Sequence, residues 1–97
     1  MKTINIAKDF SVFPGGRFKE DNEYSAEEFR DTILIPCINK YNKIIIELDG
    51  TRGYSSCFLE EAFGGLIRKG YSKSFIYNHI QFVSSRESLI REIQTYI

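Results

Sequence analysis

The order of apolar and polar residues predicts a chain that alternates between strands and helices. Residues 43–49 read Lys-Ile-Ile-Ile-Glu-Leu-Asp, a run that is too short for a helix and rich in β-branched side chains, as in a central strand. Residues 50–54 are a glycine-bounded turn, and residues 55–69 place apolar side chains at helical spacing. The apolar face of this central helix is expected to consist of Leu59, Ala62, Phe63, Leu66 and Ile67.

The residues before this unit predict a strand, a hairpin and a helix. Residues 2–7 alternate between apolar and polar side chains, which is typical of a half-buried strand. Residues 9–13 and 17–19 flank Pro14-Gly15-Gly16, so we expect them to form an N-terminal β-hairpin. Ser25 and Glu28 have the spacing of a capping box, which predicts a helix start. Pro36 either kinks this helix or ends it, and its buried face is expected to include Phe29, Ile33, Leu34 and Cys37.

The residues after the central helix predict a short helix, a strand and a last helix. Ser72 is placed as an N-cap for a helical segment that ends near Asn78 or His79. Residues 80–83 are a brief apolar strand, and Ser84 with Glu87 has the spacing of a second capping box. The core-facing stripe of the last helix is expected to contain Leu89, Ile90, Ile93 and Ile97.

Together these elements predict the α/β class. Strands and helices mix along the chain without a repeat, a low-complexity tract or a linker, so we expect residues 1–97 to form one domain. The expected architecture is a small mixed β-sheet of about four strands flanked by helices. Because the first long helix connects two strands, those two strands are expected to be parallel.

Composition narrows the range of functions. The 97 residues carry 13 basic and 13 acidic side chains, and the zero net charge argues against a dedicated nucleic-acid binder. No apolar run is long enough to span a membrane, and the first residues lack the apolar stretch of a signal peptide, so we expect a cytoplasmic protein. Cys37 and Cys57 lie far apart without metal-type spacing, which predicts free thiols and no metal or other cofactor.

The serine pair at the start of the central helix is the first candidate site. Ser55 and Ser56 stand where an N-cap is expected, and a capping oxygen there would stabilise the helix by about 1 kcal/mol. The alternative is phosphorylation, since a helix N-terminus attracts anions and a phosphate would change the charge of a docking surface. Arg52 and Tyr54, in the preceding turn, are residue types that commonly anchor interfaces.

Two adjacent glycines inside the central helix are the second candidate site. Gly64 and Gly65 each cost about 1 kcal/mol relative to alanine in a helix. On a regular helical wheel they fall on the outward face beside Glu61 and Arg68. That position indicates either the close approach of a partner protein or packing against a neighbouring helix of the same domain.

The reactive residue types near the end of the central strand permit an enzymatic or ligand-binding alternative. Asp49, Arg52 and Cys57 could share one pocket there. A magnesium site formed by Asp49 with Glu47, Glu60 or Glu61 is not expected, because the chain has no phosphate-binding Gly-Lys-Ser/Thr loop. The lone histidine, His79, is distant in sequence from Cys57 and has no evident orienting group.

Three segments together resemble a known family. Residues 46–66 read Ile-Glu-Leu-Asp-Gly-Thr-Arg-Gly-Tyr-Ser-Ser-Cys-Phe-Leu-Glu-Glu-Ala-Phe-Gly-Gly-Leu, residues 14–17 read Pro-Gly-Gly-Arg, and residues 25–30 read Ser-Ala-Glu-Glu-Phe-Arg. These segments look like the motifs of a bacterial family called the STAS-like domain of unknown function. The wider group that this family resembles includes the anti-sigma factor antagonists, which are small domains with a mixed sheet flanked by helices.

The resemblance implies a role in regulation. Anti-sigma factor antagonists bind kinase-type anti-sigma factors through the start of the corresponding helix and are switched by phosphorylation of a serine there. By position, Ser55 matches the phosphorylated serine of an Asp-Ser-Ser-Gly motif and Ser56 matches the serine after it. In this chain Tyr54 replaces the aspartate and Cys57 replaces the glycine. Family members are also similar to domains encoded with, or joined to, histidine-kinase-type ATPases, which implies such an ATPase as a partner.

The leading hypothesis is therefore a non-catalytic regulatory module that binds a protein, such as a histidine-kinase-type ATPase or an anti-sigma-like partner. Ser55 or Ser56 is the expected phosphoacceptor. A small enzyme or ligand-binding domain around Asp49, Arg52 and Cys57 remains the alternative, and a homo-oligomer subunit is a third option. The expected partner-binding residues are Thr51, Arg52, Tyr54, Ser55, Glu61, Gly64, Gly65 and Arg68.

Overall fold

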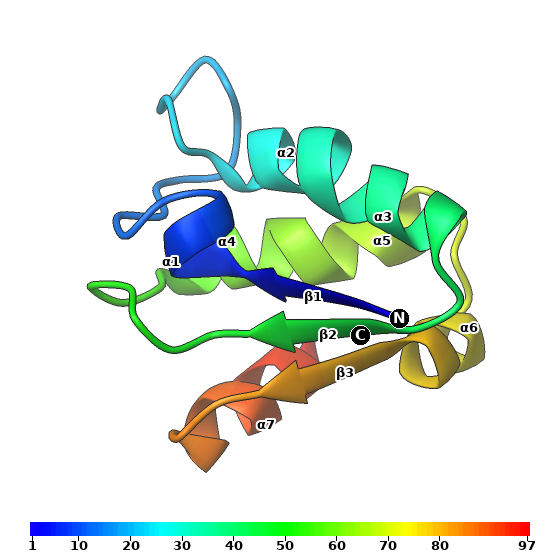
Figure 1. Ribbon diagram of the computed structural model, residues 1–97. Helices are drawn as coiled ribbons and strands as arrows, with labels where there is room; N and C mark the ends of the chain where they lie inside the picture. Colours follow the sequence, from blue (N-terminus) through cyan, green and yellow to red (C-terminus); the bar gives the residue numbers. More distant parts are fainter.

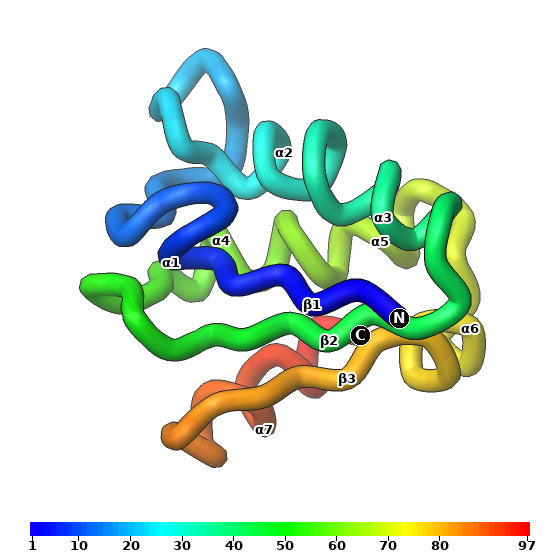
Figure 2. The backbone as a smooth tube through the Cα atoms, in the orientation of Figure 1, coloured from blue at the N-terminus to red at the C-terminus, as the bar shows by residue number.

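Three short strands form a parallel sheet in the computed structural model, which describes all residues 1–97. The strands are β1 (Lys2–Asn5), β2 (Ile44–Glu47) and β3 (Ile80–Val83), in the order β1-β2-β3. Their registers align Ile4 with Ile46 and Ile46 with Phe82, so the carboxyl ends of all three strands meet at one edge. Figures 1 and 2 show the three strands side by side and running in the same direction.

Two long helices and several shorter ones connect and follow the strands. The first long helix joins β1 to β2 and consists of α2 (Ala26–Phe29), a π-helical turn η1 (Arg30–Leu34) and α3 (Ile35–Lys40). The second follows β2 and consists of α4 (Ser56–Leu59), a π-helical turn η2 (Glu60–Gly64) and α5 (Gly65–Arg68). The remaining helices are α1 (Ile6–Asp9), α6 (Lys73–His79) and α7 (Glu87–Thr95).

The expected α/β class is confirmed, but the expected mixed sheet of about four strands is wrong in two respects. The sheet has three strands, and both strand pairs are parallel. The first strand ends at Asn5 rather than at residue 7, because the Asn5 side chain accepts the Lys8 N–H at 3.0 Å and caps α1. The hairpin expected of residues 9–13 and 17–19 does not form, since backbone groups there bond to other segments, such as the Val12 carbonyl to the Arg52 N–H. Residues 11–24, which we call the strap, then run from α1 to α2 without a strand, as Figure 2 traces.

The π turn η1 shifts the buried face of the first long helix by one residue. In this helix the buried positions include Phe29, Leu34 and Ile38, whereas Ile33 and Cys37 are only half-buried. The expected stripe through Ile33 and Cys37 assumed an uninterrupted α-helix. Such a π turn adds one residue to the helix and moves later side chains round the axis. Pro36 is the second residue of α3, and it neither ends the helix nor donates a backbone hydrogen bond.

The second long helix keeps most of its expected apolar face. Phe58, Leu59, Ala62, Phe63 and Leu66 are each 0% exposed. Of these, Phe58 was not in the expected apolar face, and the other four positions are confirmed. The expected core residue Ile67 is instead 40% exposed.

The helices cover one face of the sheet. Along β2, Ile44 and Ile46 are buried, whereas the alternating Ile45 and Glu47 are only half-buried. In Figure 1, α4 and α5 lie behind the strands, with α2 and α3 above them and α7 behind β3. The buried core of 18 residues lies between the strands and these helices, with Phe29, Phe58 and Phe63 as its largest side chains.

Helix caps confirm two of the expected starts and correct a third. Ser25 accepts the Glu28 N–H at 3.1 Å, and Ser72 accepts the Phe75 N–H at 3.1 Å. The expected capping by Ser84 does not occur, because its hydroxyl donates to Asp49 and accepts the Arg86 N–H. The last helix begins at Glu87 with Arg86 as its N-cap residue.

None of these helices is both long and apolar enough to cross a membrane.

Candidate functional site

A tight turn connects β2 to α4 at the carboxyl edge of the sheet. Gly50 and Gly53 have positive φ angles of 103° and 127°, a backbone conformation that favours glycine. The hydroxyl of Tyr54 donates to the carbonyl of Leu48 at 2.7 Å and closes the turn on itself. Burial raises the pKa of Tyr54 to about 12, which keeps this hydroxyl protonated. The turn therefore fixes the point at which α4 begins.

Ser55 begins α4 as its N-cap. Its Oγ accepts the Phe58 N–H at 3.0 Å and its hydroxyl donates to the carbonyl of Gly15 at 3.3 Å. Ser55, Ser56 and Cys57 are all exposed, so the hydroxyl pair lies at the surface, as the sequence predicts. Ser56 makes no side-chain hydrogen bond, so only Ser55 serves the structure here.

The strap packs against this turn and adds residues that the sequence pattern did not single out. The Arg52 N–H donates to the carbonyl of Val12 at 2.7 Å. The Arg52 guanidinium lies over the Phe13 ring, 5.6 Å from its centroid, although Phe13 is 60% exposed. Val12 and Phe13 were expected in a hairpin strand, and only their exposure in a proline-glycine segment could have pointed to a surface role.

Asp49 binds the loop after β3. Its carboxylate accepts the Ser85 N–H at 2.9 Å and the Ser84 hydroxyl at 3.0 Å. The Ser85 N–H, followed by the Ser84 hydroxyl, holds the pKa of the Asp49 carboxyl below its ordinary value. Asp49 thus ties the carboxyl end of β2 to that of β3, and no group of three potential metal-ligating side chains occurs in the chain.

A small cleft of about 290 Å³ lies between the turn and the start of α7. Asp49, Arg52, Tyr54 and Arg86 are among its lining residues, but Cys57 is not. The expected pocket of Asp49, Arg52 and Cys57 is therefore incomplete. Arg52 and Arg86 take part in none of the ion pairs of the molecule.

Most of the chain matches the model of a known protein family. Residues 25–89 match the model of the STAS-like domain of unknown function (DUF4325), which covers more than half of the chain. The chain belongs to this STAS-like family. No curated protein and no solved structure matches the chain.

The STAS-like match includes the parts of the carboxyl edge that β2, β3 and the following helices contribute, but not β1, α1 or the strap. It begins at Ser25, the N-cap of α2, and ends at Leu89 in α7, so it contains the turn at residues 50–54, all of α4 and the cleft-lining Arg86. Val12 and Phe13 lie before the matched segment. The strap therefore adds to the STAS-like unit a contact that lies outside the matched motif.

The expected exposed glycine face is wrong. Gly64 and Gly65 are buried, and so is Glu61, at 8% exposure. A Cβ added at Gly65 would lie 2.6 Å from Nη1 of Arg30, and one at Gly64 would lie 2.9 Å from the carbonyl oxygen of Tyr96. The glycines are thus required by close packing within the domain, which is the second of the two alternatives that the sequence left open.

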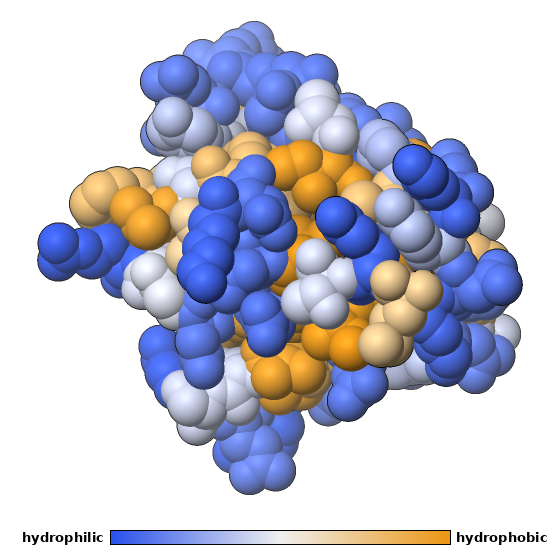
Figure 3. Space-filling model, in the orientation of Figure 1, coloured by the Kyte–Doolittle hydropathy of each residue, from blue (hydrophilic) through white to orange (hydrophobic).

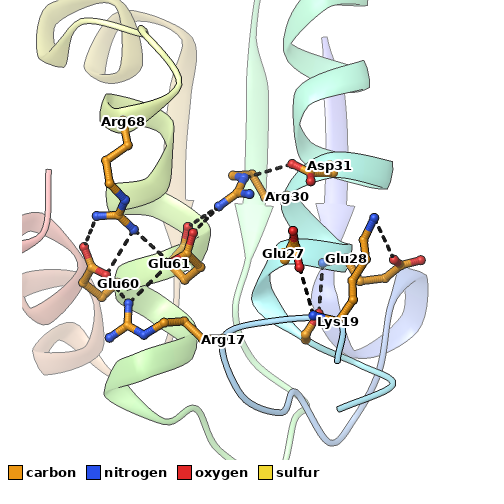
Figure 4. A network of polar contacts seen from close by, with 10 residues as sticks. Arg17, Lys19, Glu27, Glu28, Arg30, Asp31, Glu60, Glu61 and Arg68 are labelled. Carbon is orange, nitrogen blue, oxygen red and sulfur yellow. Dashed lines mark hydrogen bonds and ion pairs between the residues drawn. The ribbon is translucent and has the colours of Figure 1, made fainter. Parts of the chain in front are cut away.

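Ion-paired side chains of Arg30, Glu60 and Glu61 lie against these glycines, and Figure 4 shows the network that they form. The side chain of Arg30 is 5% exposed, and its Nη1 donates to the Glu61 carboxylate at 2.5 Å and to the Glu61 carbonyl at 3.1 Å. Arg17 of the strap and Arg68 of α5 both pair with Glu60 and Glu61. The Arg68 guanidinium is the main cause that lowers the pKa of Glu60. Arg68 is exposed as expected, but its charge is already paired within the molecule.

The predicted site residues therefore divide into two groups. Thr51, Arg52, Tyr54 and Ser55 lie together in the turn and first cap at the carboxyl edge. The other group lies in the buried network or is engaged by it, and consists of Glu61, Gly64, Gly65 and Arg68.

Proposed function

We propose that this STAS-like domain is a non-catalytic regulatory module that binds a protein partner through the carboxyl edge of its sheet. The observation that carries the proposal is the exposed helix start of Ser55, Ser56 and Cys57 beside the exposed pair of Arg52 and Phe13. Arginine and aromatic side chains are enriched among the residues that dominate interface energies.

The docking surface proposed here consists of Val12, Phe13, Thr51, Arg52 and Ser55. Val12 and Phe13 are 42% and 60% exposed and adjacent in the strap, so they present neighbouring apolar side chains to a partner. In Figure 3 apolar atoms project at the left of the molecule, where Figure 1 places the loops after α1 and β2. Because Arg52 has no ion-pair partner in the chain, a carboxylate of the bound protein is a suitable contact for it.

We propose a histidine-kinase-type ATPase as the partner and Ser55 as its phosphoacceptor, with Ser56 as the second choice. A phosphate at Ser55 would lie at the N-terminus of α4, where the helix dipole and free N–H groups favour an anion. It would also remove the hydroxyl proton that now binds the Gly15 carbonyl, so the strap would lose one of its contacts with α4. Phosphorylation would in this way change both the charge and the shape of the docking surface.

The test incubates the chain with the proposed histidine-kinase-type ATPase partner and ATP, followed by intact-mass measurement and site mapping. We expect one added phosphate on wild type and none on Ser55→Ala. Ser72→Ala is the matched control, because Ser72 is also an exposed N-cap with the same bond to the third residue of its helix. An unmodified mass with an active kinase would remove the phosphorylation proposal and leave partner binding to be judged by affinity.

The cleft favours one alternative, a ligand-binding or enzymatic domain that uses Asp49 and Arg52. Its volume of about 290 Å³ and its two unpaired arginines, Arg52 and Arg86, suit a small anionic ligand. Cys57 does not line the cleft, so its reactivity tests only the part of the sequence-based alternative that placed a reactive thiol at this edge. Alkylation by iodoacetamide at a rate no higher than that of an ordinary free thiol would count against an activated Cys57, whereas rapid alkylation at neutral pH would support it.

A further inference from the structure

One face of the parallel sheet has no helix against it. The strands lie in front of α4 and α5 in Figure 1, so Figure 3, in the same orientation, looks onto this face and shows apolar patches among polar side chains. Ile45, at the centre of the face, packs against none of the buried core residues. Parallel sheets normally have both faces covered. The open face is formed by Thr3, Asn5, Lys43, Ile45, Glu47, Gln81 and Val83, all of them exposed or half-buried.

The central strand carries a positive charge at one end and a negative charge at the other. Two such strands that run antiparallel therefore place each charge opposite its complement. Lys43 and Glu47 point to the open face with Ile45 midway between them, and the two charged residues are about 13 Å apart along the strand. Neither belongs to an ion pair within the chain. The Lys43 ammonium donates to the Asn78 carbonyl at 2.9 Å, and Glu47 has only a 3.4 Å contact with the Asn5 amide.

We propose that the open face docks against the same face of a second copy of this chain, around a two-fold axis that passes beside Ile45. In this arrangement β2 of one copy runs antiparallel to β2 of the other, so Lys43 of each copy faces Glu47 of the other. Sheets that pack face to face lie about 10 Å apart at an angle of about 30°, a separation that a lysine and a glutamate side chain can bridge together. A two-fold axis makes each contact occur twice, as in most homodimers.

The size of the face sets the expected strength of the dimer. Three strands of four residues each present a surface of about 14 by 13 Å. That is roughly 180 Å² per copy, well below the ~800 Å² per partner of a standard specific interface. The dimer is therefore a concentration-dependent one, in which the two symmetric ion pairs determine the relative orientation of the copies.

Sedimentation velocity of the full chain over a range of concentrations tests the proposal. Wild type is expected to show a monomer–dimer equilibrium. Lys43→Glu and Glu47→Lys each place like charges opposite one another twice, so each is expected to weaken the dimer by about tenfold or more. The double variant, Lys43→Glu with Glu47→Lys, restores opposite charges and is expected to recover the dimer. Lys69→Glu, an exposed change at the end of α5, is the control and is expected to leave the equilibrium unchanged.

A mixture of the two single variants gives the most specific result. A chain with glutamates at both positions complements a chain with lysines at both, so an equimolar mixture is expected to form a heterodimer that neither variant forms alone. Circular dichroism of each variant checks that it is folded. A wild-type chain that stays monomeric at every concentration, a dimer that ignores the charge changes, or a mixture of folded variants that does not associate would each overturn the proposal.

Discussion

At Gly65 the backbone of the central helix lies against the guanidinium of Arg30, and this contact explains why a helix tolerates a glycine there. Any side chain would occupy the space of Nη1, which is itself held by Glu61. The sequence shows the unusual glycine but not its neighbour, because Arg30 is 35 residues earlier in the chain. The residue type at a position such as Gly65 is thus set by a contact with a distant element, which a local sequence pattern does not reveal.

Gly65→Ala is expected to destabilise the domain by about 1–3 kcal/mol, since the added methyl group overpacks a buried ion pair. The measurement is equilibrium unfolding in urea. Gly16→Ala is the control, because the nearest atom to a Cβ at Gly16 is 4.0 Å away and its φ angle is not positive. Equal stabilities of the two variants would show that Arg30 does not restrict this position.

Because of Tyr54, the stability of the fold is expected to depend on pH in the alkaline range. Its pKa is raised from 10.0 to about 12 by burial, so the folded state holds the proton more tightly than the unfolded state. The stabilising contribution is complete below pH 10 and is lost as the pH rises towards 12. Urea unfolding at a series of pH values is expected to show a smaller loss of stability over this interval for Tyr54→Phe than for wild type. Tyr77→Phe, at a more exposed tyrosine, should keep the wild-type slope.

At the scale of elements, the two long helices carry the most informative differences from the sequence-based prediction. Strand and helix positions are evident from the sequence because the isoleucine run of β2 and the capping serines Ser25 and Ser72 act locally. The π turns are not evident, because an extra residue in a helix leaves the sequence pattern almost regular. In the first helix the π turn brings Ile38 into the core in place of the expected Cys37. The hairpin prediction for the strap was wrong because it rested on a local turn signal, whereas the hydrogen bonds of the strap run to distant segments such as Arg52.

The buried pair of Arg30 and Glu61 fastens the two long helices to each other at their π turns. Glu61→Leu leaves the Arg30 guanidinium without its main buried partner, and we expect a loss of about 3–5 kcal/mol of unfolding free energy. Thermal or chemical unfolding measures it. Glu87→Leu, which breaks the exposed pair with Arg91, is the control and is expected to cost less than about 1 kcal/mol. A similar small effect for both variants would contradict a structural role for the network.

At the scale of the whole molecule, the helices cover one sheet face and leave three surfaces with distinct characters. The carboxyl edge presents Ser55, Arg52 and Phe13, and the open sheet face presents Ile45 between two opposite charges. The outer surface of the long helices has its charges paired internally around Glu61. The sequence located the edge correctly, because it lies where a strand turns into a capped helix. It placed the glycines and Arg68 on the same surface, which only three-dimensional packing could correct.

The affinity of the proposed partner, a histidine-kinase-type ATPase, for Arg52→Glu tests the proposed docking surface most directly. Arg52 is exposed and has no ion-pair partner in the chain, so its reversal should leave stability unchanged while it repels a carboxylate of the partner. We expect titration calorimetry to show a loss of about 30-fold or more, as for a charged residue at the centre of an interface. Arg91→Glu on α7 is the control and is expected to bind as wild type does. Equal binding by wild type, Arg52→Glu and Arg91→Glu would contradict docking at the carboxyl edge.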